Sequence, residues 1–231
     1  MSDALLYTPS GCVLYLDLRK SVGDKLLDYS GHGNAGTIYG ARLEYRHPLW
    51  GLSFDGVDDY VEVPHSDVLS LTRFTIEVVL HVNEVKRMGV VRKGYGGRQN
   101  YLLRLLEDGR ILFYLETDVD SYYLYSVDKY GVKQFHVIHY VFDGDYSSGY
   151  LDARYQGRLK VDGNVKTNPD PLTIAVERPT ATGYMNYLDG VVALVRIYNR
   201  ALTAEEVKRC YEDIKLRLLR RMQPVSVSMI R

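Results

Sequence analysis

The segment Leu52–Pro64, LSFDGVDDYVEVP, contains the pattern that decides the fold. Two short apolar runs flank Asp55–Asp59, whose DG and DD steps favour a turn, and short Asp side chains readily bond to nearby backbone amides. Phe54 and Tyr60 are expected to enter the core from the two flanking strands. The segment therefore predicts two strands joined by a turn, with one aromatic ring from each strand inside the protein.

The same rhythm of short apolar runs and turns continues on both sides of this segment. Phe74–Val82 (FTIEVVLHV) alternates as a half-buried strand does, and a hairpin is predicted around Glu107–Gly109. Lys20–Gly40, rich in Gly, Asp, Asn and Ser, has the composition of a loop. The remaining predicted strands are Gly11–Leu18, Leu52–Phe54, Tyr60–Val63, Tyr101–Leu106, Arg110–Glu116, Tyr122–Val127, His136–Phe142, Tyr150–Tyr155, Leu172–Val176 and Val191–Tyr198.

Strands that recur about every ten residues with turn signals between them predict an all-β fold, a two-sheet antiparallel β-sandwich. Alternation within each run selects the side chains that face the core. These are Phe54, Tyr60, Phe74, Ile76, Val78, Ile138, Tyr140, Val195 and Ile197.

One long helix is predicted near the end of the chain, from about Ala204 to Arg220. Thr203 followed three residues later by Glu206 is a capping-box signature, and apolar residues then recur at helical spacing. The chain is thus expected to be a single domain over residues 1–231, with a β core of about 11–202 and a helix and extension of about 203–231. The extension from Lys215 either closes the edge of the sandwich or serves as a docking segment for self-association.

Composition and charge narrow the range of partners. The 231 residues carry 29 basic and 29 acidic side chains, so nothing in the total indicates nucleic acid as a partner. The N-terminal MSDALLYTPS lacks the pattern of a signal peptide, and no apolar run approaches the roughly 20 residues of a membrane span. Cys12 and Cys210 permit one disulfide, and their spacing does not match a zinc site. The compartment is left open.

Three segments, in this order, are similar to the laminin-G-like, concanavalin A-like lectin/glucanase jelly-roll family. Asp28–Gly36 (DYSGHGNAG) resembles its early glycine-rich turn, Leu52–Pro64 its central signature, and Leu188–Leu202 (LDGVVALVRIYNRAL) its closing strand and helix entry. The resemblance covers the chain from about Val13 to Tyr211. It implies a concanavalin A-like jelly roll, a fold that does not by itself determine function.

The resemblance also implies a calcium site near the early turn, where Asp28 and Asn34 are the matching side chains. The family's closing strand usually reads Ile-Asp-Glu-Val-Arg, whereas this chain has Ala193 and Leu194 at the acidic positions. Calcium needs several oxygen ligands at once, so the loss of this pair weakens the site. No cofactor is expected to be required. Ca²⁺ is the one cofactor whose binding the sequence leaves open.

Glycosidase chemistry is weighed because some sandwiches of this fold resemble laminarinase-type glucanases, whose strand carries Glu-x-Asp-x-x-Glu. The nearest run here, Glu116-Thr117-Asp118-Val119-Asp120, lacks the second glutamate and leads into a loop. Solvated turn acids explain it better than a catalytic pair. There is no GxSxG, HExxH or P-loop motif. We therefore expect no catalytic residues and no enzymatic activity.

Tyrosine is over-represented, with 21 Tyr against 5 Phe and 1 Trp. Tyrosines suit half-buried strands, and they also suit sugar-binding surfaces because a ring offers a flat apolar face. The candidate ligand-binding residues are Tyr122, Tyr123 and Tyr125, together with Tyr95 and Arg98 in the loop KGYGGRQN. The alternative for each tyrosine is ordinary packing in the core or at a sheet edge.

The sequence thus favours a non-catalytic recognition or adhesion module that binds carbohydrate or a glycosylated surface such as a glycoprotein. A structural or assembly protein of a virion or cell-surface layer is the alternative, and a glycoside hydrolase is the third choice.

Overall fold

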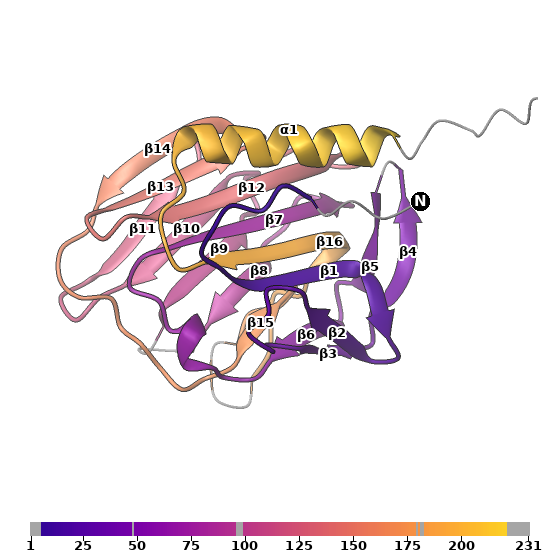
Figure 1. The fold of residues 1–231 in the computed structure, drawn as a ribbon, viewed down its shortest axis with the longest axis horizontal. Coiled ribbons are helices and arrows are strands. Elements are labelled where there is room, and N and C mark those ends of the chain that lie inside the picture. The colour runs from indigo at the N-terminus through magenta and orange to yellow at the C-terminus, as the bar shows by residue number, and fades with distance from the viewer. Residues whose placement is uncertain (1–5, 48, 96–98, 179, 181–182, 221–231) are drawn as a thin grey trace, which may run out of the picture.

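The computed structural model describes residues 6–47, 49–95, 99–178, 180 and 183–220 (Figure 1). This part of the chain is mostly β, with one α-helix. Its strands are β1 (Cys12–Val22), β2 (Lys25–Asp28), β3 (Gly36–Tyr39), β4 (Arg42–Arg46), β5 (Leu49–Asp55), β6 (Tyr60–Val63), β7 (Phe74–Val82), β8 (Met88–Lys93), β9 (Tyr101–Leu105), β10 (Ile111–Glu116), β11 (Ser121–Tyr125), β12 (Phe135–Phe142), β13 (Tyr146–Leu151), β14 (Arg154–Lys160), β15 (Leu172–Ile174) and β16 (Asp189–Tyr198). The helix is α1 (Ala204–Arg220), and a 3-10 turn covers Asp67–Leu69.

Antiparallel hydrogen bonding joins the strands into one large sheet. The path runs β11-β10-β9-β8-β15-β6-β3-β2-β1-β16-β7-β12-β13-β14, and β4 joins it through β5, which pairs with β16. The two ends of the path come back into contact between β11 and β14, so the sheet is curled almost into a barrel. Because β1 hydrogen-bonds to β2, the hydrogen bonding does not divide the strands into two separate sheets. The two-sheet arrangement stays a prediction.

The interior of this curled sheet holds the main apolar core. Eight of the nine side chains expected to face it are buried at 1% exposure or less: Phe54, Phe74, Ile76, Val78, Ile138, Tyr140, Val195 and Ile197. The alternation in β7 and β12 therefore identified the core face of the two strands at the centre of the fold.

Tyr60 is the exception, and its inward placement was wrong. In β6 the valines Val61 and Val63 enter the core, and Tyr60 lies on the opposite face, half-buried. There its ring stacks on Tyr39 of β3 at 4.4 Å and on Tyr184 at 4.8 Å. Stacking partners from distant segments thus hold an aromatic residue on the outer face.

Two predicted features near β13 and β3 also needed correction. The strand expected over 150–155 is a hairpin, because β13 and β14 are joined by Asp152 and Ala153, both in the left-handed region (φ 52° and 61°). Two such residues match the twist of a two-residue hairpin turn. The segment Lys20–Gly40, expected to be a loop, contains the short strands β2 and β3.

Helix α1 covers one outer face of the sheet, as Figure 1 shows. Ile214 packs against Ala193 and Leu194 of β16, and Val207 and Cys210 pack against Tyr198. This packing gives a reason for the apolar pair in the closing strand, since acidic side chains at 193 and 194 would be buried beneath the helix. No helix in the described ranges is both long and apolar enough to span a membrane.

The capping box at the start of α1 is formed as predicted. Thr203 and Glu206 exchange hydrogen bonds, from the Thr203 amide to the Glu206 carboxylate at 2.9 Å and from the Glu206 amide to Thr203 Oγ1 at 3.2 Å. Arg200 also donates to this carboxylate at 2.6 Å and 2.8 Å. The Arg200 hydrogen bonds are the main cause that lowers the pKa of Glu206 from 4.5 to about 2.

We expect Glu206→Gln to lower the free energy of unfolding by about 1 kcal/mol at pH 7. Because the folded-state pKa lies below the unfolded value, the stabilisation by Glu206 is complete above about pH 4.5 and is lost as the pH falls toward 2. The difference between the two proteins, measured by denaturant titration, should therefore shrink over this interval. Glu212→Gln, at an exposed position of the same helix, is the control. A difference that does not change with pH would contradict this account.

Candidate functional site

The outer face that α1 leaves free carries a groove over β9, β10 and β11. Strand pairing aligns Arg104, Leu112 and Tyr125 in one row across these three strands. This row points away from the core, because the neighbouring positions Leu103 and Phe113 are core residues. The groove has a volume of about 310 Å³, and its lining residues are Arg87, Arg104, Leu106, Glu107, Asp108, Arg110, Leu112, Tyr123 and Tyr125.

Two tyrosines give the groove its aromatic surface. Tyr123 and Tyr125 are 49% and 42% exposed and lie on the same face of β11. Tyr123 leans edge-on against the buried Tyr114 with ring centroids 4.9 Å apart, and the guanidinium of Arg110 lies 4.9 Å from the ring centroid of Tyr125. Both rings are thus held in place by neighbours while much of their surface stays open to a ligand.

Two of the three arginines that line the groove are paired with carboxylates. Arg110 bonds to Asp108 at 2.7 Å, and its backbone and side-chain N–H groups lower the pKa of that carboxyl, which is therefore ionised near neutral pH. Arg104 forms a bidentate ion pair with Glu177. Among the described residues, Arg87 is the groove arginine for which the structure shows no ion pair. The groove therefore combines one paired arginine and aspartate with the apolar Leu112.

The candidate residues divide into those that line this groove and those that do not. Tyr123 and Tyr125 line it. Tyr122 points to the opposite face of β11, where it packs against the core and its hydroxyl bonds to the backbone of Asp162 at 3.0 Å and 3.1 Å. Tyr95 lies elsewhere, with its ring 5.4 Å from the guanidinium of Arg178. Arg98 lies outside the described residues.

Most of the groove was missed from the sequence. Arg104 lies on β9, Asp108 and Arg110 lie in the β9–β10 turn, and Arg87 directly precedes β8. None of them belongs to a recognisable motif. The signal that was available is the predicted hairpin around Glu107–Gly109, whose register aligns Arg104 with Leu112. The pairing of β11 with β10, which adds Tyr123 and Tyr125 to the groove, could be seen only in the structure.

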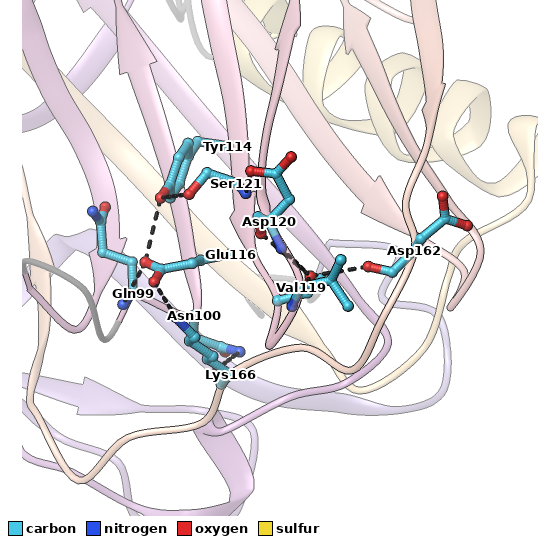
Figure 2. Close-up of polar contacts among 10 residues, drawn as sticks. Gln99, Asn100, Tyr114, Glu116, Val119, Asp120, Ser121, Asp162 and Lys166 are labelled. Carbon is cyan, nitrogen blue, oxygen red and sulfur yellow. Dashed lines mark hydrogen bonds and ion pairs between the residues drawn. The ribbon is translucent and has the colours of Figure 1, made fainter.

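Figure 2 shows the polar contacts around Glu116, where the acidic run of the sequence begins. Glu116 is 5% exposed, and its carboxylate accepts from Lys166 Nζ at 2.6 Å, from the Gln99 amide at 3.2 Å and from the Tyr114 hydroxyl at 3.3 Å. Asp118 accepts the backbone and side-chain N–H groups of Asn164 at 2.8 Å and 3.1 Å. These carboxylates are thus engaged in holding the end of the β10–β11 hairpin.

In the early glycine-rich turn, internal hydrogen bonds use the acceptor positions of the Asp28 carboxylate. Asp28 Oδ1 accepts the amides of Tyr15 and Ser30, both at 2.9 Å, and Oδ2 accepts the Ser30 hydroxyl at 2.8 Å and the Asn34 amide at 2.9 Å. The side-chain amide of Asn34 donates to the Val13 carbonyl at 3.0 Å. A carboxylate has about four acceptor positions, and here four donors fill them.

Two other groups of side chains within the described residues have the composition of a metal site. Asp55, Asp58 and Asp59 lie together in the β5–β6 turn, where Asp55 and Asp59 bond to backbone amides of that turn. Glu77, His139 and Cys210 are buried beneath α1, where Glu77 is already paired with Arg196 at 2.6 Å. A divalent cation there would lie beside a buried guanidinium, which disfavours it.

Cys12 and Cys210 are both free thiols, and Cys12 Sγ donates to the Leu14 carbonyl at 3.2 Å. The extension from Lys215, expected either to close the edge of the sandwich or to mediate self-association, lies in part beyond the described residues, which end at 220. Both roles stay predictions.

Solved structures of low sequence identity share this fold. The binding domain of Paraclostridial Mosquitocidal Protein 1 aligns with a TM-score of 0.71 at 15% identity, over 88% of this chain and 52% of that one. Trypanosoma rangeli sialidase in complex with sialic acid gives 0.69 at 16% identity, over 90% and 34%. Domain 4 of AbnA, a GH43 extracellular arabinanase from Geobacillus stearothermophilus, in complex with arabinotriose, gives 0.70 at 14% identity, over 87% and 98%.

The chain therefore spans about half of the mosquitocidal protein's binding domain, a third of the sialidase and nearly all of the arabinanase domain. No curated protein sequence matches it. A laminin-G family model, described as the Concanavalin A-like lectin/glucanases superfamily, matches residues 55–208, which is more than half of the chain. The chain belongs to this superfamily.

Proposed function

We propose that this protein is a non-catalytic recognition module that binds carbohydrate through the groove on β9, β10 and β11. The observation that carries the proposal is the pair of exposed tyrosine rings, Tyr123 and Tyr125, beside a paired arginine and aspartate. Ring faces pack against the CH groups of a sugar, and the few polar groups beside them fix its orientation. The arabinanase domain that shares this fold was solved with arabinotriose, which supports a glycan ligand.

The pairing of charges favours a neutral glycan as the ligand. Arg110 and Asp108 present donors next to an acceptor in the groove, and Arg104 is bound to the buried Glu177. Neighbouring sugar hydroxyls can accept from Arg110 and donate to Asp108. An anionic ligand would have to compete with the carboxylates already bound to these two guanidinium groups.

We expect Tyr125→Ala and Tyr123→Ala each to raise the Kd for a glycan about five- to tenfold, because an aromatic contact contributes about 1 kcal/mol. A glycan array identifies the ligand, and titration calorimetry then measures the change. Tyr155→Ala is the matched control, since Tyr155 is 53% exposed on β14 and does not line the groove. Equal losses in all three variants, or none, would contradict a site at Tyr123 and Tyr125.

Absence of glycosidase activity is part of the same proposal. A glycosidase needs one carboxyl to donate a proton and a second on the other side of the bond. Glu107 and Asp108 are adjacent in one turn of the groove, and Asp108 is held ionised by Arg110. We expect no reducing sugar to be released from β-glucan, xylan or arabinan. Release that disappears in Glu107→Gln or Glu116→Gln would place the protein among the glycosidases.

We also propose that calcium is not required, because the Asp28 carboxylate is filled by four internal donors. The melting temperature should differ by less than about 1 °C between millimolar CaCl₂ and EDTA. Occupancy at 100 times Kd would stabilise the fold by about 2.7 kcal/mol and raise the melting temperature by several degrees. A rise of that size that is lost in Asp28→Asn would assign the site to Ca²⁺.

A further inference from the structure

A histidine is buried between α1 and the sheet that this helix covers. His139 lies on the same face of β12 as Val137 and Val141. These two valines pack in the apolar clusters that also contain residues of α1. His139 is fully buried, and among the described residues neither of its ring nitrogens has a hydrogen-bond partner. A buried polar group without a partner costs free energy, so this ring is an unusual member of the contact between α1 and the sheet.

Each element packed around His139 brings a titratable group toward it. β7 contributes Glu77, the strand neighbour of His139, whose Oε2 lies 3.8 Å from Nε2. α1 contributes Cys210, and its thiol sulfur, a ring nitrogen of His139 and a carboxylate oxygen of Glu77 lie within 4.8 Å of one another. β16 contributes Arg196, which pairs with Glu77 in the next position of the same row across the strands. β13 contributes Tyr150, the strand neighbour on the other side.

These groups leave a charge on His139 poorly compensated. The two carboxylate oxygens of Glu77 already accept from Arg196 at 2.6 Å and from the Tyr198 hydroxyl at 3.2 Å. The distance of 3.8 Å from His139 to Glu77 is too long for a hydrogen bond, and the guanidinium of Arg196 opposes a second cation. Burial outweighs the attraction of Glu77 and of Asp152, and it lowers the pKa of His139 from 6.5 to about 4.

The lowered pKa makes the attachment of α1 depend on pH. While the helix is attached, His139 stays neutral down to about pH 4, whereas a solvated histidine takes up a proton near pH 6.5. The state with the helix released therefore binds more protons between these two values. Attachment is consequently strongest above pH 6.5 and weakens as the pH falls toward 4.

The apolar core inside the curled sheet is built separately from α1. Among the described residues, the cluster that forms this core contains no side chain of the helix. α1 instead meets the sheet in two smaller clusters on the outer face, through Ile214 in one and through Val207 and Cys210 in the other. Asp213 also accepts the Tyr7 amide at 2.7 Å. Loss of the helix therefore removes contacts on the outer face and leaves the inner core in place.

We infer that His139 is an acid-sensitive switch: protonation of its ring releases α1 from β7, β12 and β16 and uncovers the apolar outer face of these strands, while the sheet stays folded. The uncovered face carries Val79, Val137, Val141 and Leu194. The inference is independent of the proposed carbohydrate site, because the groove lies over β9, β10 and β11.

The test follows the accessibility of Cys210, which is fully buried while α1 is attached. In a Cys12→Ser background Cys210 is the one remaining cysteine. Its reaction with 4,4′-dithiodipyridine is measured between pH 7 and about pH 4.5, relative to that of N-acetylcysteine at each pH. With a histidine pKa of 6.5 in the released state and about 4 in the attached state, we expect the relative rate to rise roughly 50-fold over this interval.

Two substitutions remove the titrating ring, and a third serves as the matched control. His139→Gln keeps a polar side chain and His139→Leu replaces it by an apolar one, and in both we expect a rise of less than about threefold. His47→Gln, at an exposed histidine that follows β4, should keep the full rise. Hydrogen exchange at about pH 4.5 should show lost protection in α1 and retained protection in β9 and β10.

Two results would overturn the inference. One is a relative rate that stays flat in the Cys12→Ser protein, or that rises as much after either substitution of His139. The other is a loss of protection in β9 and β10 together with α1, which would indicate global unfolding in place of release of the helix. Because hydrogen exchange uses the unsubstituted protein, this second readout decides the matter even if the variants fold poorly.

Discussion

The ion pair between Glu77 of β7 and Arg196 of β16 lies beneath α1, and both side chains are fully buried, 2.6 Å apart. Burial alone opposes the charge on Arg196, but the adjacent carboxylate overcomes this effect and raises the pKa of the guanidinium above its usual value. Arg196 also donates to the Tyr7 carbonyl at 2.7 Å and to Thr8 Oγ1 at 2.8 Å. Loss of either member would leave a buried charge unpaired, which would lower the free energy of unfolding by about 3–5 kcal/mol. One pair thus ties two central strands to the segment before β1 on the helix-covered face.

The opposite outer face has a related arrangement with a different result. There Glu177 is the buried carboxylate, and Arg92 and Arg104 are its partners. The segment that carries Glu177, residues 176–178 and 183–187, is held over β8 and β6 by the hydrogen bond from the Gly89 amide to Asn186 and by the stacking of Tyr184 on Tyr60. The groove with Tyr123 and Tyr125 lies over β9, β10 and β11.

Residues close together in the chain could be predicted from the sequence, and contacts between distant segments could not. The start of α1 followed from the Thr203–Glu206 capping box, and the core face of β7 followed from alternation. Tyr60 was placed wrongly because its stacking partners, Tyr39 and Tyr184, come from a strand and a loop that alternation did not reveal. The turn at Asp152 lacked the glycine that usually marks a two-residue hairpin.

The candidate site shows the same limit. Tyr123 and Tyr125 could be selected from the sequence because alternation on one strand brings them to one face. Tyr122 was grouped with them by proximity in the sequence, although the same alternation sends it to the core side. Glu177, the ion-pair partner of the groove residue Arg104, is separated from it by 73 positions, so only the folded chain reveals this pair.

Under the proposed function, the small volume of the groove limits how strongly a single module can hold a glycan. Few sugar atoms would touch the rings of Tyr123 and Tyr125, and each sugar hydroxyl would exchange water for protein hydrogen bonds with a small net gain. A stable attachment to a glycosylated surface would then arise when several sites bind together, because the second contact is made at a high effective concentration.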